Sequence, residues 1–134
     1  MKRAMGAVLP LLLIVSSAWA QKTGSTVQKI ELTATALGKA ESLEARALKG
    51  WSGPTEFLAV RVRAAMENGE VIRVLVDTAS GPANLPLGRI TILDGAGELQ
   101  LSRTPFGGTL PIPISEIEAV RLVNAAGVLA EGSF

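Results

Sequence analysis

The sequence predicts a single all-β domain, an antiparallel β-sandwich of Ig-like dimensions with about seven or eight strands. Three observations predict it. Short runs of alternating apolar and polar residues recur along the chain, turn-forming residues separate them, and only 114–122 has some helical character, enough for one turn before its strand. A small β-barrel made from the same strands is the alternative.

The first 20 residues have the pattern of a secretory signal peptide. Lys2 and Arg3 precede an apolar run at 7–15, and Ala18-Trp19-Ala20 forms a small-residue cleavage signal. The apolar run is shorter than the roughly 20 residues that a membrane-spanning helix needs. We therefore expect cleavage after Ala20, one domain at 21–134 with no membrane span, and a periplasmic or secreted location.

The first three predicted strands are 27–37, 42–48 and 56–66. Apolar and polar residues alternate clearly in the first and third runs and more weakly in the second. A three-residue loop at 67–69 would join the third strand to the next, 71–77. That register places Val62 opposite Val74, gives Gly69 a left-handed conformation, and sets Arg63 opposite Arg73.

A second hairpin is predicted in "GRITILDGAGELQLS", residues 88–102. A four-residue loop at 94–97 places Ile92 opposite Leu99, with Asp94 as the turn cap and Gly97 at positive φ. The stretch 118–133 repeats this pattern thirty residues later, with Asn124 in place of Asp94. The repetition indicates a hairpin used twice.

These patterns predict which side chains form the core. The predicted core residues are Ile30, Leu32, Leu58, Val60, Val62, Ile72, Val74, Val76, Ile90, Ile92, Leu99, Leu101, Val120, Leu122 and Leu129.

The composition argues against most site chemistries. The chain has no cysteine, histidine or tyrosine, so the usual zinc and copper ligands and the Ser-His-Asp and Cys-His arrangements are missing. The "DGAGE" stretch at 94–98 lacks the glycine spacing of a phosphate loop and enough oxygen ligands for calcium. We expect no cofactor, no metal and no catalytic residue.

The balance of charge argues against a nucleic-acid partner. Without Lys2 and Arg3, 11 of the 13 basic residues remain against 12 acidic ones. A net charge near −1 supplies no strong attraction to nucleic acid. The absence of cysteine also favours a bacterial periplasm over a eukaryotic secretory pathway.

Three arginines are the first candidate site. In the register described above, Arg61, Arg63 and Arg73 share one face of one hairpin, which would form a small anion-binding or partner-binding patch. The alternative, which we favour, is an ordinary surface on which a neighbouring strand supplies Glu44 or Glu31 as counter-charges.

The segment "TPFGGTLPIPIS", residues 104–115, is the second candidate. Phe106 with Pro111 and Pro113 would make it a recognition loop for a partner. The alternative, which we favour, is a stiff crossover whose apolar side chains, Phe106 among them, cover the end of the core.

From Glu56 onward the chain resembles a loose group of small exported bacterial β-sandwich proteins. The residues that match the sequence pattern of this group are "VLVDT", "LGRITILDGAGELQL" and "AVRLVNAAGVLAEGSF". In addition, "LGKAESLEARAL" at 37–48 resembles an early strand of that group. The group has no assigned activity, so the resemblance implies a fold and no site residues.

We expect a non-enzymatic binding or structural module of the bacterial envelope. Its partner would be an envelope protein or a polysaccharide. Two alternatives stay open: an adhesion or inhibitor module that uses the 104–115 loop, and a small hydrolase that uses Ser and Lys or paired carboxylates.

Overall fold

The computed structural model describes residues 25–134, so the predicted signal peptide at 1–20 lies outside the described residues. The elements in this part of the chain are β1 Ser25–Ala34, α2 Ala36–Ala40, β2 Glu44–Ser52, β3 Thr55–Arg63, β4 Val71–Thr78, β5 Leu85–Thr91, β6 Ala96–Thr104, β7 Gly107–Gly108, the 3-10 helix η1 Ile114–Glu116, β8 Ile117–Asn124 and β9 Gly127–Ser133. The all-β class is confirmed, as is the single helical turn before β8.

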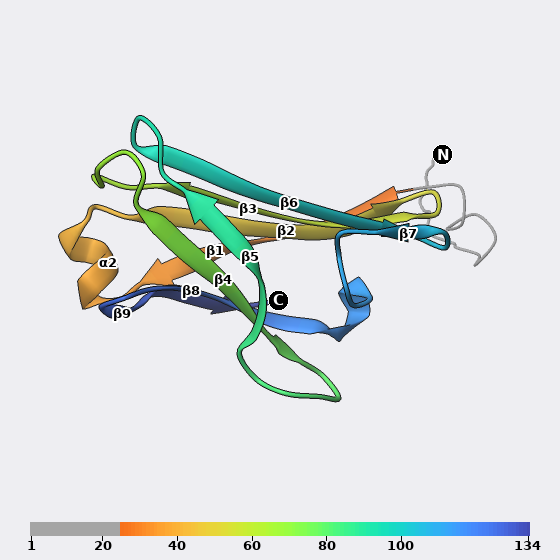
Figure 1. The fold of residues 1–134 in the computed structure, drawn as a ribbon. Coiled ribbons are helices and arrows are strands. Elements are labelled where there is room, and N and C mark those ends of the chain that lie inside the picture. The colour runs from red at the N-terminus through yellow and green to blue at the C-terminus, as the bar shows by residue number, and fades with distance from the viewer. Residues whose placement is uncertain (1–24) are drawn as a thin grey trace, which may run out of the picture.

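The strands form one antiparallel sheet in the order β5-β4-β8-β9-β1-β2-β3-β6-β7. The sheet curls on itself, so that β4 and β5 cross in front of β2, β3 and β6 (Figure 1). This curvature fits the small-barrel alternative, and the sandwich is not confirmed. β1 connects the two halves, because it pairs with β2 over residues 25–32 and with β9 only at Thr33 and Ala34.

The predicted hairpin between 56–66 and 71–77 is wrong. β3 pairs with β2 and β6, whereas β4 pairs with β5 and β8. The segment between them, which contains Gly69 at the expected positive φ (93°), carries the chain from one half of the sheet to the other. Alternation specifies which side chains point inward, but several strands offer the same inward phase and it cannot choose among them.

The predicted pairing of Ile92 with Leu99 is also wrong. Asp94 and Gly95 form a two-residue turn with φ values of 53° and 77°, closed by a bridge between Leu93 and Ala96. Beyond the turn, β5 stays with β4 and β6 joins β3. Gly97, predicted at positive φ, is not among the residues with positive φ.

The repeat at 118–133 does form the expected hairpin, β8–β9. Asn124 caps the turn, since its Oδ1 accepts hydrogen bonds from the backbone N–H groups of Ala126 (2.9 Å) and Gly127 (3.3 Å). A bulge between Leu122 and Val123 shifts the register, so that Leu122 lies opposite Ala130 instead of Leu129.

The first predicted strand ends earlier than expected, at Ala34, because Thr35 caps a short helix. The Thr35 Oγ1 accepts a hydrogen bond from the Gly38 N–H and donates one to the Val128 carbonyl (2.6 Å). Gly38 lies against the Leu129 carbonyl oxygen with no room for a Cβ atom. The helix therefore packs directly on the backbone of β9.

The core fills the inside of the curled sheet, and the predicted core residues all contribute to it. Most are buried, and three pack half-buried against the rest: Ile30, Leu99 and Leu101. Inward side chains from both halves of the sheet, for example Val60 and Val74, are completely buried. Burial of this apolar surface is the main stabilising term of the fold.

Candidate functional site: an arginine depression and an aromatic hairpin

The structure separates Arg73 from the two arginines with which it was grouped. Arg61 and Arg63 lie on β3, whereas Arg73 lies on β4, opposite Arg89 of β5. The arginine that does lie opposite Arg61 is Arg46 of β2. The pattern in 42–48 alternates too weakly to reveal this pairing, so Arg46 was missed.

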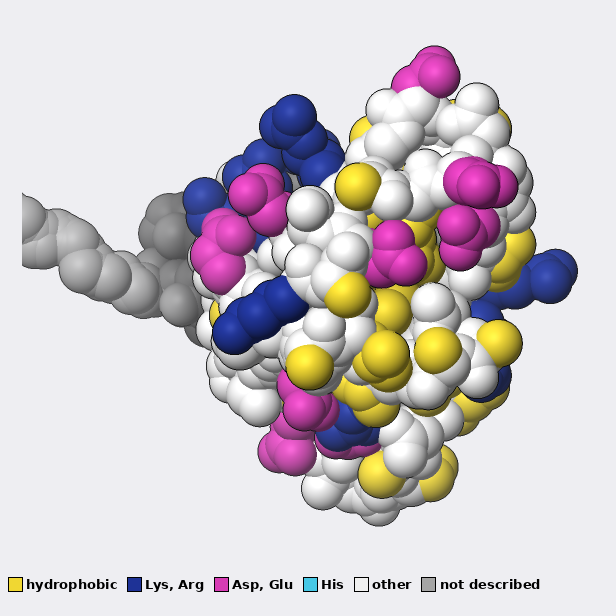
Figure 2. Space-filling view, turned by 90° about the vertical axis from the view of Figure 1, so that its left-hand side faces the viewer, with side chains coloured by type: hydrophobic (Ala, Val, Ile, Leu, Met, Phe, Trp, Pro, Cys, Tyr) yellow, Lys and Arg dark blue, Asp and Glu magenta, His cyan; other side chains and the backbone are white. Residues whose placement is uncertain are grey.

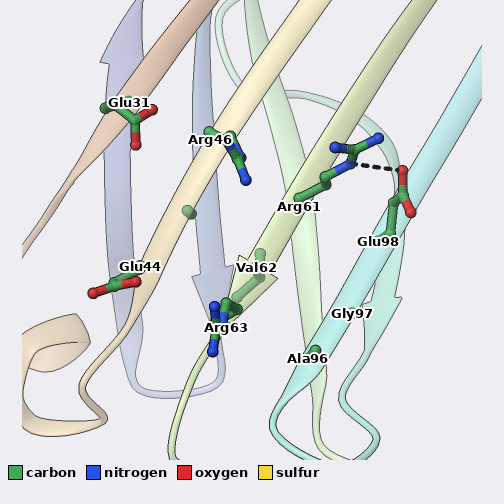
Figure 3. A pocket seen from close by; sticks show the side chains of 10 residues that line it. Glu31, Glu44, Arg46, Arg61, Val62, Arg63, Ala96, Gly97 and Glu98 are labelled. Atoms are coloured by element: carbon green, nitrogen blue, oxygen red, sulfur yellow. Dashed lines mark hydrogen bonds and ion pairs between the residues drawn. The ribbon is translucent and has the colours of Figure 1, made fainter.

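Arg46, Arg61 and Arg63 line a depression of about 590 Å³ on the outer face of β1, β2, β3 and β6, which we call the arginine depression (Figure 3). Glutamates surround them: Glu31 lies opposite Arg46, Glu44 opposite Arg63, and Glu98 opposite Arg61. The depression is open beside Arg63 because its neighbour on β6 is the small Ala96.

Only one of the three arginines forms an ion pair within the described chain. The Arg61 Nε donates to Glu98 Oε2 at 3.1 Å. The Arg46 and Arg63 side chains form no ion pair with any side chain of residues 25–134. Counter-charges from neighbouring strands are thus present, as the alternative interpretation predicted. The N–H groups of the Arg46 and Arg63 guanidinium groups nevertheless stay available to other acceptors.

Glu98, at the β6 side of the depression, does not have the electrostatics of a general acid. A hydrogen bond from Gln100, and then one from Arg61, lower the pKa of Glu98 below its usual range. A glycosidase acid needs a raised pKa instead. Such a carboxylate stays ionised and serves better as a hydrogen-bond acceptor.

Phe106, the second candidate, is 98% exposed. It forms a two-residue turn with Pro105 between β6 and β7, because Thr104 pairs with Gly107. The Thr104 Oγ1 accepts from the Phe106 N–H and donates to the Gly107 carbonyl, both at 3.2 Å. We call residues 104–108 the aromatic hairpin.

The rest of the 104–115 segment packs on the protein. Thr109 and Leu110 donate backbone hydrogen bonds to the Ser102 carbonyl (2.8 and 2.9 Å), and Leu110 is buried. Ile112 and Ile114 are half-buried against the core, and Pro111 and Pro113, each directly before one of them, are exposed. The crossover interpretation is therefore right for these three apolar side chains and wrong for Phe106.

A buried lysine, which the sequence analysis missed, holds this crossover in place. Lys49 is 9% exposed, and its Nζ donates to the carbonyls of Ile114 (3.1 Å) and Ile117 (2.6 Å). The Phe134 ring centroid lies 4.6 Å from the same Nζ. Lys49 forms no hydrogen bond to a serine of residues 25–134, so the Ser and Lys pair of the hydrolase alternative is not assembled around it.

One end of the molecule carries α2 and the turns β3–β4, β5–β6 and β8–β9. Figure 2 shows this end, with hydrophobic side chains scattered among charged ones. Leu93 (61% exposed), Val71 (41%) and Leu37 (40%) are exposed large apolar residues of the turns and the helix at this end. Single exposed apolar side chains of this kind are normal on protein surfaces.

Within residues 25–134 no group of three or more His, Asp or Glu side chains is placed to hold a metal ion. No helix of the described chain is long and apolar enough to cross a membrane. In comparisons with known proteins, no family model, no curated protein and no solved structure matches the chain. The function must therefore be argued from the two surface features.

Proposed function

We propose that the protein is an exported, non-enzymatic binding module of the bacterial envelope that recognises a protein partner through the aromatic hairpin. The observation that carries this proposal is the nearly complete exposure of Phe106. A phenylalanine offers more than 100 Å² of apolar surface, on the order of that buried by aromatic anchors at interfaces. An apolar pocket on the partner is the complementary surface.

The construction of the hairpin supports this proposal. Gly107 and Gly108 adopt φ values of 132° and 147°, and a Cβ atom at Gly108 would collide with the Ser102 carbonyl oxygen. The ring is thus presented on a turn that its own hydrogen bonds and the anchored Leu110 hold in shape. A preorganised backbone turn loses little backbone entropy on binding.

The export part of the proposal rests on residues 1–20 alone. The positive residues, the apolar run and the Ala18-Trp19-Ala20 signal support secretion. Mass spectrometry of the periplasmic protein from a Gram-negative host tests it. We expect a mature N-terminus at Gln21, and an uncleaved chain that stays in the cytoplasm would contradict the proposal.

Site-specific photo-crosslinking tests the binding role. We expect a photoreactive amino acid at position 106 to capture one discrete protein in the source organism, and the same amino acid at exposed Arg89 not to capture it. The purified partner should then bind Phe106→Ala about tenfold or more weakly than wild type, since truncated anchors cost 2 kcal/mol or more. Pro111→Ala, in the anchored part of the segment, is the matched control.

Two results would contradict the proposal. One is the same set of crosslinks from positions 106 and 89, which indicates contact by chance. The other is an identified partner that binds Phe106→Ala as tightly as wild type.

A further inference from the structure

The order of charges in the arginine depression is unusual for a sheet surface. Across four neighbouring strands it runs Glu31, Arg46, Arg61, Glu98, so that two arginines are directly opposite each other in the centre. Like charges in this position destabilise a sheet. Arg63, two residues along β3, adds a third positive charge on the same face. Arg46 and Arg63 each have a glutamate on the neighbouring strand but form no ion pair within residues 25–134, so their guanidinium donors stay available.

We propose that the arginine depression binds the carboxylate of an acidic saccharide. Arg46 and Arg63 donate hydrogen bonds to the carboxylate, and Glu98 holds Arg61 beside them. The three glutamates accept hydrogen bonds from the ligand hydroxyl groups. This site is independent of the aromatic hairpin, so the failure of one proposal leaves the other standing.

The chemistry of the lining selects this ligand among anions. A guanidinium group matches a planar carboxylate in bidentate fashion. The carboxylates of Glu31, Glu44 and Glu98 repel a doubly charged group, such as a phosphate monoester, more strongly than a single carboxylate, and they accept hydrogen bonds from neutral hydroxyls. A uronic acid has this combination, because each sugar carries one carboxylate and several hydroxyl groups.

The size and place of the depression suit a sugar that belongs to a chain. About 590 Å³ lies within the range of small-ligand sites. Its lining comes from four strands of an exposed sheet face, β1, β2, β3 and β6, rather than from a closed cavity, so a polysaccharide could continue beyond it on both sides. Figure 3 shows the three arginines on adjacent strands with Glu44 and Glu98 on either side of them.

A second pair of arginines serves as a control for non-specific attraction of an anion by positive charge. Arg73 and Arg89 are also directly opposite on neighbouring strands, and both are exposed. Neither lines the depression, and no carboxylate of residues 25–134 forms an ion pair with either. A ligand held by charge alone would use this pair as well.

The test is a titration of the purified protein with trigalacturonate, followed by NMR chemical shifts and calorimetry. The methyl ester of trigalacturonate is the neutral probe, and inorganic phosphate is the simple anion. We expect trigalacturonate to shift the amide signals of β2 and β3 around residues 46, 61 and 63, and the methyl ester to have no effect. Arg46→Gln or Arg63→Gln should each weaken binding about tenfold or more, whereas Arg73→Gln should bind as wild type does.

Three outcomes would overturn the proposal. Equal weakening by Arg73→Gln would show attraction by net charge. Phosphate binding as tight as that of trigalacturonate would show a simple anion site. No binding at millimolar trigalacturonate by a protein whose thermal unfolding is normal would show that the depression has no saccharide role.

Discussion

Replacement of Lys49 by methionine tests whether the buried ammonium group is a structural link. The variant leaves the buried Ile117 carbonyl without its 2.6 Å donor, and an unsatisfied buried acceptor costs about 1–3 kcal/mol. It also removes the contact with the Phe134 ring, which is worth about 0.5–2 kcal/mol. The methionine variant no longer carries the desolvation cost of a buried ammonium group, which offsets part of this loss. We expect the free energy of unfolding to fall by about 1–3 kcal/mol.

Urea unfolding followed by circular dichroism measures this change, with exposed Lys29→Met as the matched control. For a domain of about 100 residues each kcal/mol corresponds to about 4–8 °C in Tm. An unfolding free energy of Lys49→Met equal to or above that of wild type would refute the reasoning, because it would show that the cost of burying the charge exceeds the value of its hydrogen bonds.

The pH dependence supplies a second measurement on the same pair of proteins. Burial lowers the pKa of Lys49 below its ordinary 10.5, and Glu118 partly opposes the shift. Between the lowered pKa and 10.5 the unfolded chain binds more protons than the folded one, so the stability of wild type rises with pH in this window. We expect the stability of Lys49→Met to lack this rise, and an identical slope in both proteins would contradict the burial of the charged group.

Three further predictions concern other parts of the fold. A hydrogen bond from Arg121 lowers the pKa of Asp77, so this carboxylate stabilises the fold above its ordinary pKa range, and its contribution is lost as pH falls through the lowered pKa. Asp77→Asn should therefore cost about 1–2 kcal/mol at neutral pH in urea unfolding, and a difference from wild type that does not shrink as the pH falls below the ordinary pKa of an aspartate would be inconsistent with this role. Gly108→Ala forces a Cβ atom against the Ser102 carbonyl and should abolish the hydrogen-exchange protection of the Thr109 and Leu110 amides; unchanged protection would show that the hairpin tolerates the substitution. Leu58→Ala empties a position that is 1% exposed and should lower the unfolding free energy by about 2–5 kcal/mol; a loss under 1 kcal/mol would show that the core collapses around the gap.

The sequence predicted well which side chains point inward, but it predicted poorly which strands are neighbours in the sheet. Alternation in β3 and β4 placed Val60, Val62 and Val74 correctly in the core. The same alternation suggested that these two strands pair, whereas they belong to different halves of the curled sheet. A hairpin is the simplest connection between consecutive strands, and nothing in the residues of 64–70 shows that the chain crosses there from one half of the curled sheet to the other.

The candidate sites show the same division. Arg61 and Arg63 share a face because they are two residues apart on one strand, which the sequence shows directly. Arg46 and Glu98 join them only through the pairing of β2 and β6 with β3. The exposure of Phe106 depends on a two-residue turn that its neighbours Leu110 and Ile112 do not share.

One signal for Lys49 was present in the sequence. In β2 it has the same phase as Ala45 and Ala47, both of which point into the core. A lysine at an inward position must find acceptors inside the protein. Its acceptors lie in η1 and β8, more than sixty residues away, so the phase could reveal the burial but not the partners.

The sequence by itself determined the all-β class, the inward face of each long strand and the β8–β9 turn. Each of these depends on residues that are close together in the chain, where the period of two and the chemistry of Asn and Gly act directly. Only the tertiary structure decided which strands are neighbours, and with them the arginine depression, the link from Lys49 and the exposure of Phe106. Those features depend on long-range pairing, which is chosen by the packing of the whole core and not by any local segment.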